Sequence, residues 1–221
     1  MGAASRDVPF YANPDSTHCF QAALRMVLKF FRPAEDFSWA QLDAITAKAD
    51  DIGTWPFAGL TWLCDQGFDV RNIELMDNRR FARDGHSYLV EFLGADVVTA
   101  SRLAADLSPE QAAAARFVDI VSCETRIPDR DDLERLLADG YLVICNVNSR
   151  TLNDTEGYSG HFVVVMSCDE SELVLHDPGQ PPTPQRRVPT AKFERAWAYP
   201  HERAKNVVAI RLQDRRTSRH A

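Results

Sequence analysis

The second half of this chain contains four short, almost continuously apolar segments that follow one another closely. Runs of this length that are rich in branched aliphatic residues and bounded by turn residues are typical of strands buried on both faces. The segments are YLVICNVN (141–148), HFVVVMSC (161–168), ELVLHDPG (172–179) and NVVAIRL (206–212). Because the connections between them are short, we expect these strands to form one sheet.

The first half of the chain has helical periodicity instead. Apolar residues recur at three- and four-residue spacing from 19 to 31, after a short apolar segment, 8–11, that predicts a strand. Ser16 and Thr17 are the candidate N-caps of this helix. Further helices are predicted at 38–49, 56–67, 129–140 and 189–200, with a strand at 68–75 and a proline-rich turn at 180–185.

Residues 77–126 form a long block in which only helical patterns are recognised. His86 follows a glycine within it and is expected at the surface. We interpret the block as a helical insertion that covers a cleft, with helices at 81–93, 95–107 and 108–120. The total length of 221 residues suits one domain, and the basic end of the chain, 213–221, is expected to be a flexible tail.

The overall composition excludes several classes of function. Hydrophobic residues make up 45% and charged residues 26% of the chain, which is typical of a soluble globular protein. The net charge of −7 argues against a nucleic-acid-binding protein, and no run of about eighteen apolar residues predicts a membrane span. The N-terminus lacks a signal-peptide pattern, and five cysteines at irregular spacing do not indicate a disulfide framework. We therefore expect a cytoplasmic protein with reduced thiols, without nucleic-acid or membrane partners and without a cofactor.

Three residues stand out as candidates for chemistry. Cys19 lies in the first predicted turn of the 19–31 helix, where unpaired backbone N–H groups and the helix dipole lower the pKa of a thiol. His161 follows Gly160 at the start of a buried strand, and Asp177 ends the next strand. If the two strands form an antiparallel hairpin, the Asp177 carboxylate lies beside the His161 ring. Each residue also has a purely structural interpretation. In that case Cys19 is a core thiol, His161 is a histidine hydrogen-bonded to its loop, and Asp177 is a turn residue.

A metal site made by His161, Cys168 and His176 is a further alternative. The spacing of seven and eight residues on adjacent strands matches no common zinc pattern. Side chains alternate along a strand, so His176 is expected to face away from Asp177. The pattern therefore favours a nucleophile with a base over a metal centre.

In this combination the chain resembles the papain-like cysteine peptidases, and more narrowly cysteine peptidase family 39 and its relatives, which include the double-glycine leader peptidases of bacteriocin export. The resemblance covers residues 8–75 and 127–212, and it rests on VPFYANPDSTHC, DLERLLADGYLVICNVN, GHFVVVMSCDESELVLHDPG and AKFERAWAY. It implies an α+β fold in which an N-terminal helical part, with the nucleophile helix, packs on a C-terminal antiparallel β-sheet. It also implies a stand-alone, single papain-like domain over residues 1–221.

The same resemblance implies a role for each candidate residue. Cys19 would be the nucleophile, His161 the general base, and Asp177 the residue that orients the imidazole ring. The side-chain amide of Asn13 and the backbone N–H of Cys19 would form the oxyanion hole. The family usually has glutamine where Asn13 stands and glycine where Phe20 follows the nucleophile, so Phe20 is expected to border the cleft.

The function implied by the resemblance is hydrolysis by a cysteine-dependent peptidase or amidase. The reaction would pass through a thioester acyl-enzyme, on a peptide, amide or thioester substrate. An acyltransferase that uses the same triad and a binding module without catalysis are the two alternatives.

Overall fold

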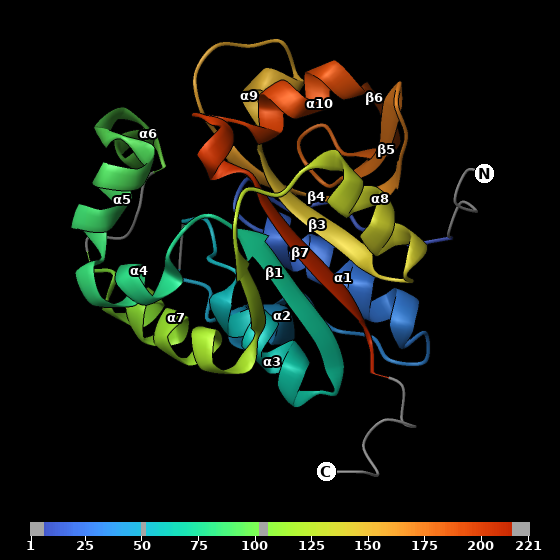
Figure 1. Cartoon of the computed structure of the whole chain (residues 1–221). Coiled ribbons are helices and arrows are strands. Elements are labelled where there is room, and N and C mark those ends of the chain that lie inside the picture. The colour runs from blue at the N-terminus through green and yellow to red at the C-terminus, as the bar shows by residue number, and fades with distance from the viewer. Residues whose placement is uncertain (1–6, 50–51, 102–105, 214–221) are drawn as a thin grey trace.

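A computed structural model describes residues 7–49, 52–101 and 106–213 (Figure 1). Within these residues the centre of the fold is a seven-stranded sheet with the strand order β2-β1-β7-β3-β4-β5-β6. Neighbouring strands are antiparallel, except that β1 and β2 are parallel. The strands are β1 (Phe68–Glu74), β2 (Ser122–Thr125), β3 (Leu142–Asn148), β4 (Gly160–Cys168), β5 (Glu172–Asp177), β6 (Thr183–Pro189) and β7 (Asn206–Leu212).

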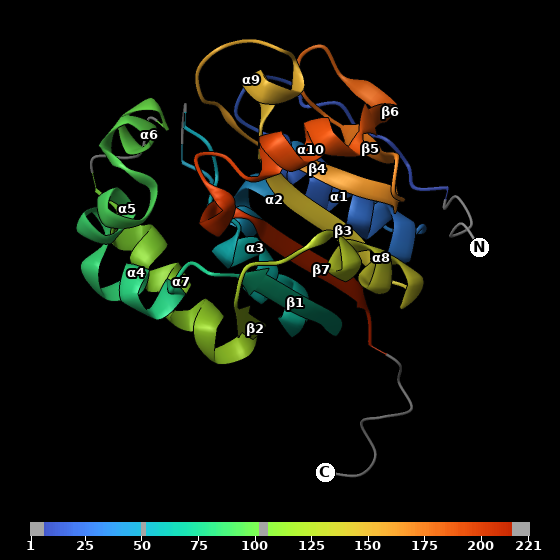
Figure 2. The same ribbon diagram turned by 45° about the horizontal axis from the view of Figure 1, so that its top comes forward.

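Helices cover both faces of this sheet (Figures 1 and 2). The core of one face is closed by α1 (Cys19–Phe31), α2 (Trp39–Thr46) and α3 (Phe57–Asp65). The core of the other face is closed by α8 (Arg130–Ala138), α9 (Ser149–Leu152) and α10 (Thr190–Trp197). A short 3₁₀ helix, η1 (Glu202–Ala204), precedes β7.

The central strands carry apolar side chains on both faces. In β3, Leu142 and Ile144 join the core under α1, whereas Val143 and Cys145 join the core under α8 and α10. Because side chains alternate along a strand, a strand covered on both faces is apolar at nearly every position. The prediction that the four apolar segments share one sheet is confirmed.

The predicted helices outside the 77–126 block and the first strand are also confirmed, the 19–31 helix with the predicted bounds and the others with shorter ones. The single helix predicted at 81–93 is wrong, because Gly85 separates two helices there. Ser38 and Gln41 form the expected capping box at the start of α2, which ends at Thr46. The 56–67 segment forms α3, with Pro56 at its N-cap position, and the 68–75 segment forms β1. The fold class is therefore α+β, as predicted.

Two details before α1 were predicted wrongly. Residues 8–11 are not in a strand, although Val8 is buried and its carbonyl accepts a hydrogen bond from His176. The N-cap position is taken by His18 rather than by Ser16 or Thr17. The Thr17 hydroxyl and backbone N–H both donate to Asp15 instead, which holds Thr17 in a local turn.

Two strands were not predicted, β2 and β6, and both lie at the edges of the sheet. All residues of β2 are exposed, and β6 (TPQRRVP) has a mostly polar sequence that begins inside the predicted proline-rich turn. Edge strands face solvent and tolerate charged residues and proline, so they lack the apolar pattern that identifies central strands. The sheet consequently extends beyond the C-terminal half of the chain.

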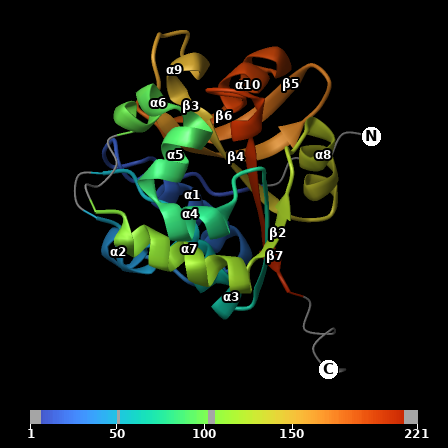
Figure 3. The same ribbon diagram turned by 60° about the vertical axis from the view of Figure 1, so that its left-hand side comes forward.

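The 77–126 block is helical except for β2. Its helices are α4 (Asn78–Asp84), α5 (His86–Leu93), α6 (Ala95–Ala100) and α7 (Ser108–Ile120). They form a group beside β1 and α3, in which α7 contacts both α3 and α4 (Figure 3). Residues 102–105 of the predicted 95–107 helix, and the expected tail after residue 213, lie outside the described residues. No helix in the described part of the chain is long and apolar enough to cross a membrane.

Candidate active site

Cys19 is the first residue of α1 and is 9% exposed. The hydrogen-bond ladder of the helix begins with the Ala22 N–H, which donates to the His18 carbonyl. The backbone N–H groups before Ala22 therefore point out of the helix end, where the helix dipole favours negative charge. This position of Cys19 was predicted from the sequence.

The structure brings His161 and Asp177 together at one end of the β4–β5 hairpin. The two strands are antiparallel, with Val164 opposite His176, as predicted. The His161 Nε2–H donates to Asp177 Oδ1 at 2.7 Å, and both side chains are buried. A buried imidazole held by a carboxylate in this way has its ring orientation and tautomer fixed.

Two further groups hold the Asp177 carboxylate. Arg186 of β6 donates to Oδ2 at 2.7 Å, and the Gly179 N–H donates to Oδ1 at 3.0 Å. Burial raises the pKa of Asp177, but the hydrogen bond and charge of His161, with these donors, outweigh it and bring the pKa to about 2. Asp177 is thus ionised throughout the neutral range.

The charges of Cys19 and His161 stabilise each other. Burial raises the pKa of the Cys19 thiol, but hydrogen bonding and attraction from the His161 ring outweigh burial and lower the pKa below its ordinary value. Burial lowers the pKa of His161, whereas Asp177 and Cys19 raise it, to about 10. Because Nε2 is bound to Asp177, Nδ1 is the ring nitrogen left for the sulfur. The arrangement favours a thiolate–imidazolium pair.

Asn13 lies at the same helix end, with its side chain held in one orientation. Its Oδ1 accepts hydrogen bonds from the backbone N–H groups of Asp15 (3.2 Å) and His18 (3.1 Å), and its own backbone N–H donates to the Pro178 carbonyl. Since the oxygen must face these two donors, the Nδ2 end of the amide faces the other way. Asn13 is therefore joined both to the start of α1 and to the turn after Asp177.

The expectation that Phe20 borders the cleft is wrong. Its side chain is fully buried, and its ring centroid lies 5.0 Å from that of Phe162. A Cβ atom added at Gly59 would lie 2.9 Å from the Phe20 ring, so the absence of a side chain in α3 makes room for the phenyl group. The large residue after Cys19 is accommodated in the core and is not among the described residues that line the cavity beside Cys19.

Arg186 and Gly179 were not predicted from the sequence. Arg186 lies in the unpredicted edge strand β6, so the sequence offered no reason to bring it near Asp177. A Cβ atom at Gly179 would lie 2.9 Å from Asp177 Oδ1 and 3.2 Å from His161 Nε2, which explains the need for glycine. The DPG motif was interpreted only as a turn, although its glycine was the available signal.

The metal-site alternative has no geometric support. Both ring nitrogens of His176 are occupied, because Nε2 donates to the Val8 carbonyl and Nδ1 accepts from the Gln185 N–H. Among the described residues, no group of three or more His, Cys, Asp and Glu side chains is arranged to hold a metal ion. His86 is exposed, as expected.

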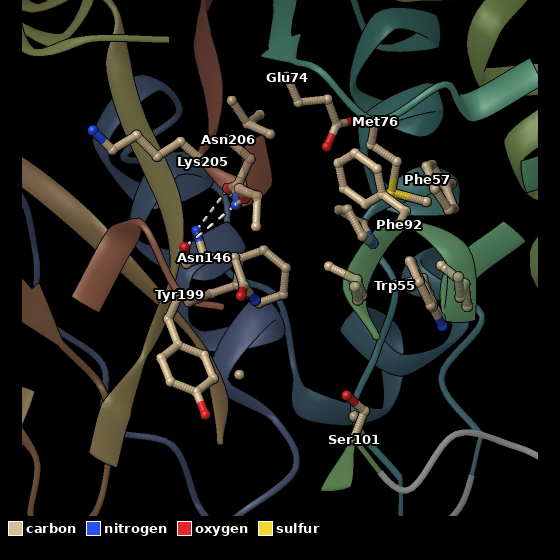
Figure 4. A pocket seen from close by; sticks show the side chains of 18 of the residues that line it. Trp55, Phe57, Glu74, Met76, Phe92, Ser101, Asn146, Tyr199, Lys205 and Asn206 are labelled. Atoms are coloured by element: carbon tan, nitrogen blue, oxygen red, sulfur yellow. Dashed lines mark hydrogen bonds between the residues drawn. The ribbon is translucent and has the colours of Figure 1, made fainter. Parts of the chain in front are cut away.

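A cavity of about 240 Å³ opens beside Cys19 (Figure 4). Phe57 of α3 and Phe92 of α5 line it on one side, and Asn146 of β3 and Asn206 of β7 line it on the other. Val98 of α6 also lines it. The helical 77–126 block therefore contributes a wall to the space next to the thiol.

No family model matches the sequence, and no curated protein matches it. Two solved structures are similar over nearly the whole chain. The peptidase domain of Streptococcus ComA, a bifunctional ABC transporter of a quorum-sensing pathway, is 15% identical with a TM-score of 0.51, and the match covers 93% of this chain and 99% of that domain. A protein from Bacillus anthracis described as a C39-like peptidase is 14% identical with a TM-score of 0.50, covering 97% and 99% of the two chains.

These similarities define the class of fold. The chain has the papain-like α+β fold, and more narrowly the form of that fold found in C39 peptidase domains. The resemblance stated from the sequence predicted this fold, and it is confirmed.

Proposed function

We propose that this protein is a cysteine-dependent hydrolase of the peptidase or amidase type. The observation that carries the proposal is the buried arrangement of Cys19, His161 and Asp177, in which the pKa of the thiol is lowered and that of the imidazole is raised. Such opposite shifts in a pair of groups beside a cavity are typical of a nucleophile with its acid–base partner. Similarity to two peptidase domains supports the same reaction class.

In the proposed reaction, the Cys19 thiolate attacks the carbonyl carbon of the substrate. The Cys19 N–H and the Asn13 amide stabilise the oxyanion of the tetrahedral intermediate. The C–N bond breaks as protonated His161 gives its Nδ1 proton to the leaving amine, and a thioester with Cys19 remains. His161 then takes a proton from water, the hydroxide oxygen displaces sulfur, and the carboxylic acid leaves.

Asp177 acts as a positioning residue in this scheme. It binds the ring nitrogen that does not face the sulfur, so it fixes the tautomer and stabilises the imidazolium form. Arg186 and the Gly179 N–H keep the carboxylate ionised and oriented. The domain proposal is consistent with this scheme: one papain-like domain, with residues 77–126 as a helical insertion beside the site.

Two alternatives to hydrolysis use the same fold. An acyltransferase would use the same residues but pass the acyl group to an amine or thiol instead of water. The departures from the family pattern at Phe20 and Asn13 would suit a binding module without catalysis, but Phe20 is in the core. The lowered pKa of Cys19 is a property that a binding module does not need.

The proposal is tested by the pH dependence of Cys19 alkylation. Iodoacetamide labelling is followed by mass spectrometry of the tryptic peptide 7–25, which contains no other cysteine. In the natural protein we expect fast labelling down to pH 6, because the thiolate is stabilised by the imidazolium. In His161→Ala the rate at pH 6 should fall about 100-fold, because an ordinary thiol with a pKa of about 8.5 is less than about 1% ionised there.

His86→Ala is the matched control, since this histidine is exposed and remote from Asp177 in the hairpin. Its profile should equal that of the natural protein, and circular dichroism should be the same for all three proteins. An ordinary thiol profile in both the natural protein and His161→Ala would overturn the proposed function.

A further inference from the structure

Four residues form a row across the sheet beneath the cavity. The strand register pairs Glu74 with Asn206, and Asn146 with Phe162. Asn206 Oδ1 accepts a hydrogen bond from the Asn146 N–H at 2.8 Å, which joins the two pairs across β7 and β3. Residues opposite each other in register point to the same face of a sheet. The row therefore presents polar side chains toward one space.

One end of this row, Phe162, contacts Cys19, and the other end is Glu74. The backbone of Phe162 hydrogen bonds to the Cys19 sulfur, whereas Glu74 is the last residue of β1. Three strand spacings of about 4.8 Å separate the two ends, or about 14 Å. An elongated group attached at Cys19 and lying along the row therefore reaches toward Glu74.

The wall that faces the polar row is apolar. Trp55, Phe57, Met76 and Phe92 line the cavity on that side. Figure 4 has Trp55 and Phe57 on the right and Asn146 and Tyr199 on the left, with the Glu74 carboxyl group pointing inward from the top. A chain or ring that occupies this space buries its apolar surface against the aromatic wall.

Glu74 is the only acidic side chain among the described residues that line the cavity. Asn72 and Asn78 both donate to Oε1, each at 2.7 Å, and no described residue hydrogen bonds to Oε2. Burial raises the pKa of this carboxyl group more than the two amides lower it. A carboxyl group in this position is stabilised by a partner that supplies positive charge or a hydrogen-bond donor.

The cations that line the cavity are directed elsewhere. The Lys205 ammonium group binds Glu194 and Glu202 and lies over the ring of Trp197. The Arg203 guanidinium lies over the ring of Phe92, and Arg203 is exposed. Neither neutralises the Glu74 carboxyl group, so the negative end of the cavity is available to a ligand.

We propose that the cavity binds the part of the substrate next to the reacting carbonyl. This part has an apolar body, and an amine at its far end binds Glu74. This inference rests on the proposed function, because it takes Cys19 as the point of attack. It narrows the substrate class to amides or peptides with an elongated, amine-ended group.

The test compares alkylating agents that differ only at their far end. The probes are N-(6-aminohexyl)iodoacetamide and N-heptyliodoacetamide, which place an ammonium or a methyl group at the same distance, with iodoacetamide as the small reference. Shorter and longer pairs, with four and eight methylene groups, map the distance to Glu74. The rate of Cys19 labelling is measured at pH 7 and at probe concentrations below saturation.

We expect the amine-ended probe to label Cys19 about tenfold faster than its methyl-ended partner, the size of one charge-assisted hydrogen bond to a buried carboxylate. In Glu74→Gln this ratio should fall to about one, because the amide carries no charge. Glu91→Gln is the matched control, because Glu91 lies on α5 and is exposed, and it should retain the full ratio.

The outcomes separate the two proposals. Fast iodoacetamide labelling of Cys19 without preference for the amine, in the natural protein, would overturn the amine site and leave the proposed function standing. Slow labelling with all probes and an ordinary thiol profile would overturn the proposed function. The ratio of the amine-ended to the methyl-ended labelling rate in the natural protein tests the amine site even if Glu74→Gln does not fold.

Discussion

Two buried thiols, Cys19 and Cys145, lie in the cores on opposite faces of the sheet and differ in their chemistry. Cys145 is fully buried in the core under α8 and α10, and burial raises its pKa well above the ordinary value. Cys19 is 9% exposed in the core under α1, and the His161 ring lowers its pKa despite burial. Burial alone makes a thiol inert, and a buried opposite charge makes it a nucleophile.

The two faces also differ in how completely they are closed. Under α8 and α10, aliphatic residues from β3, β4 and β5 pack against Phe193 and Trp197. The other face contains the cavity, the polar row that ends at Glu74, and the accessible part of Cys19. One side of the sheet therefore supplies stability, whereas the other combines packing with a site.

The largest expected effect compares the two thiols within one molecule. At pH 6, iodoacetamide should label Cys19 more than about 100-fold faster than Cys145, because Cys145 is almost entirely protonated and is also inaccessible. The tryptic peptides 7–25 and 136–150 report the two residues separately. In urea the ratio of the two labelling rates should approach one. Equal rates in the folded protein would contradict the difference in reactivity between Cys19 and Cys145.

A smaller effect is expected when the carboxylate that supports His161 loses its charge. In Asp177→Asn, labelling of Cys19 at pH 6 should fall about ten- to thirtyfold, because one pKa unit corresponds to a tenfold change in ionisation. His161 has its pKa raised to about 10, so the imidazolium is present below that value and is lost as pH rises through it. The pKa of His161, followed by NMR of the ring protons, should therefore be lower in this variant than in the natural protein.

Asp169→Asn is the control for that variant. Asp169 lies in the turn of the same hairpin, where it accepts hydrogen bonds from the Ser171 and Glu172 N–H groups. In this control the pKa of His161 should be that of the natural protein. An unchanged His161 pKa in Asp177→Asn would mean that Asp177 does not support the imidazolium.

The smallest effect separates two adjacent arginines of β6. Arg186 binds Asp177 and is 19% exposed, whereas Arg187 pairs with Glu172 at the surface. Arg186→Gln should slow Cys19 labelling at pH 6 about threefold, because this partly exposed charge acts on Cys19 only through Asp177 and His161. Arg187→Gln should leave the rate unchanged, and equal rates in the two variants would argue against a positioning role for Arg186.

The sequence was most informative where local pattern and burial coincide. The apolar segments of β3, β4, β5 and β7, the capping box of α2 and the start of α1 at Cys19 were all predicted. His161 and Asp177 were also predicted to be neighbours, because a short turn joins their strands. A hairpin is a local structure, so its pairing depends mainly on the sequence between its strands.

Several features required the whole fold. Phe20 was expected at the cleft, but the missing side chain of Gly59, a residue of α3, gives it space in the core. Arg186 reaches Asp177 only because the polar segment of β6 pairs at the edge of the sheet. Edge pairing depends on the neighbouring strand rather than on the apolar pattern of the segment itself, so the sequence did not indicate it.

By itself the sequence determined the buried strands, the helix that begins at Cys19 and the hairpin that carries His161 and Asp177, because each is a product of local periodicity. Only the tertiary structure decided that the thiol meets the imidazole, and that Asn146, Asn206 and Glu74 continue the same row across the sheet. The physical reason is that these contacts join segments distant in the chain. Their geometry depends on strand register and helix packing, which no single segment contains.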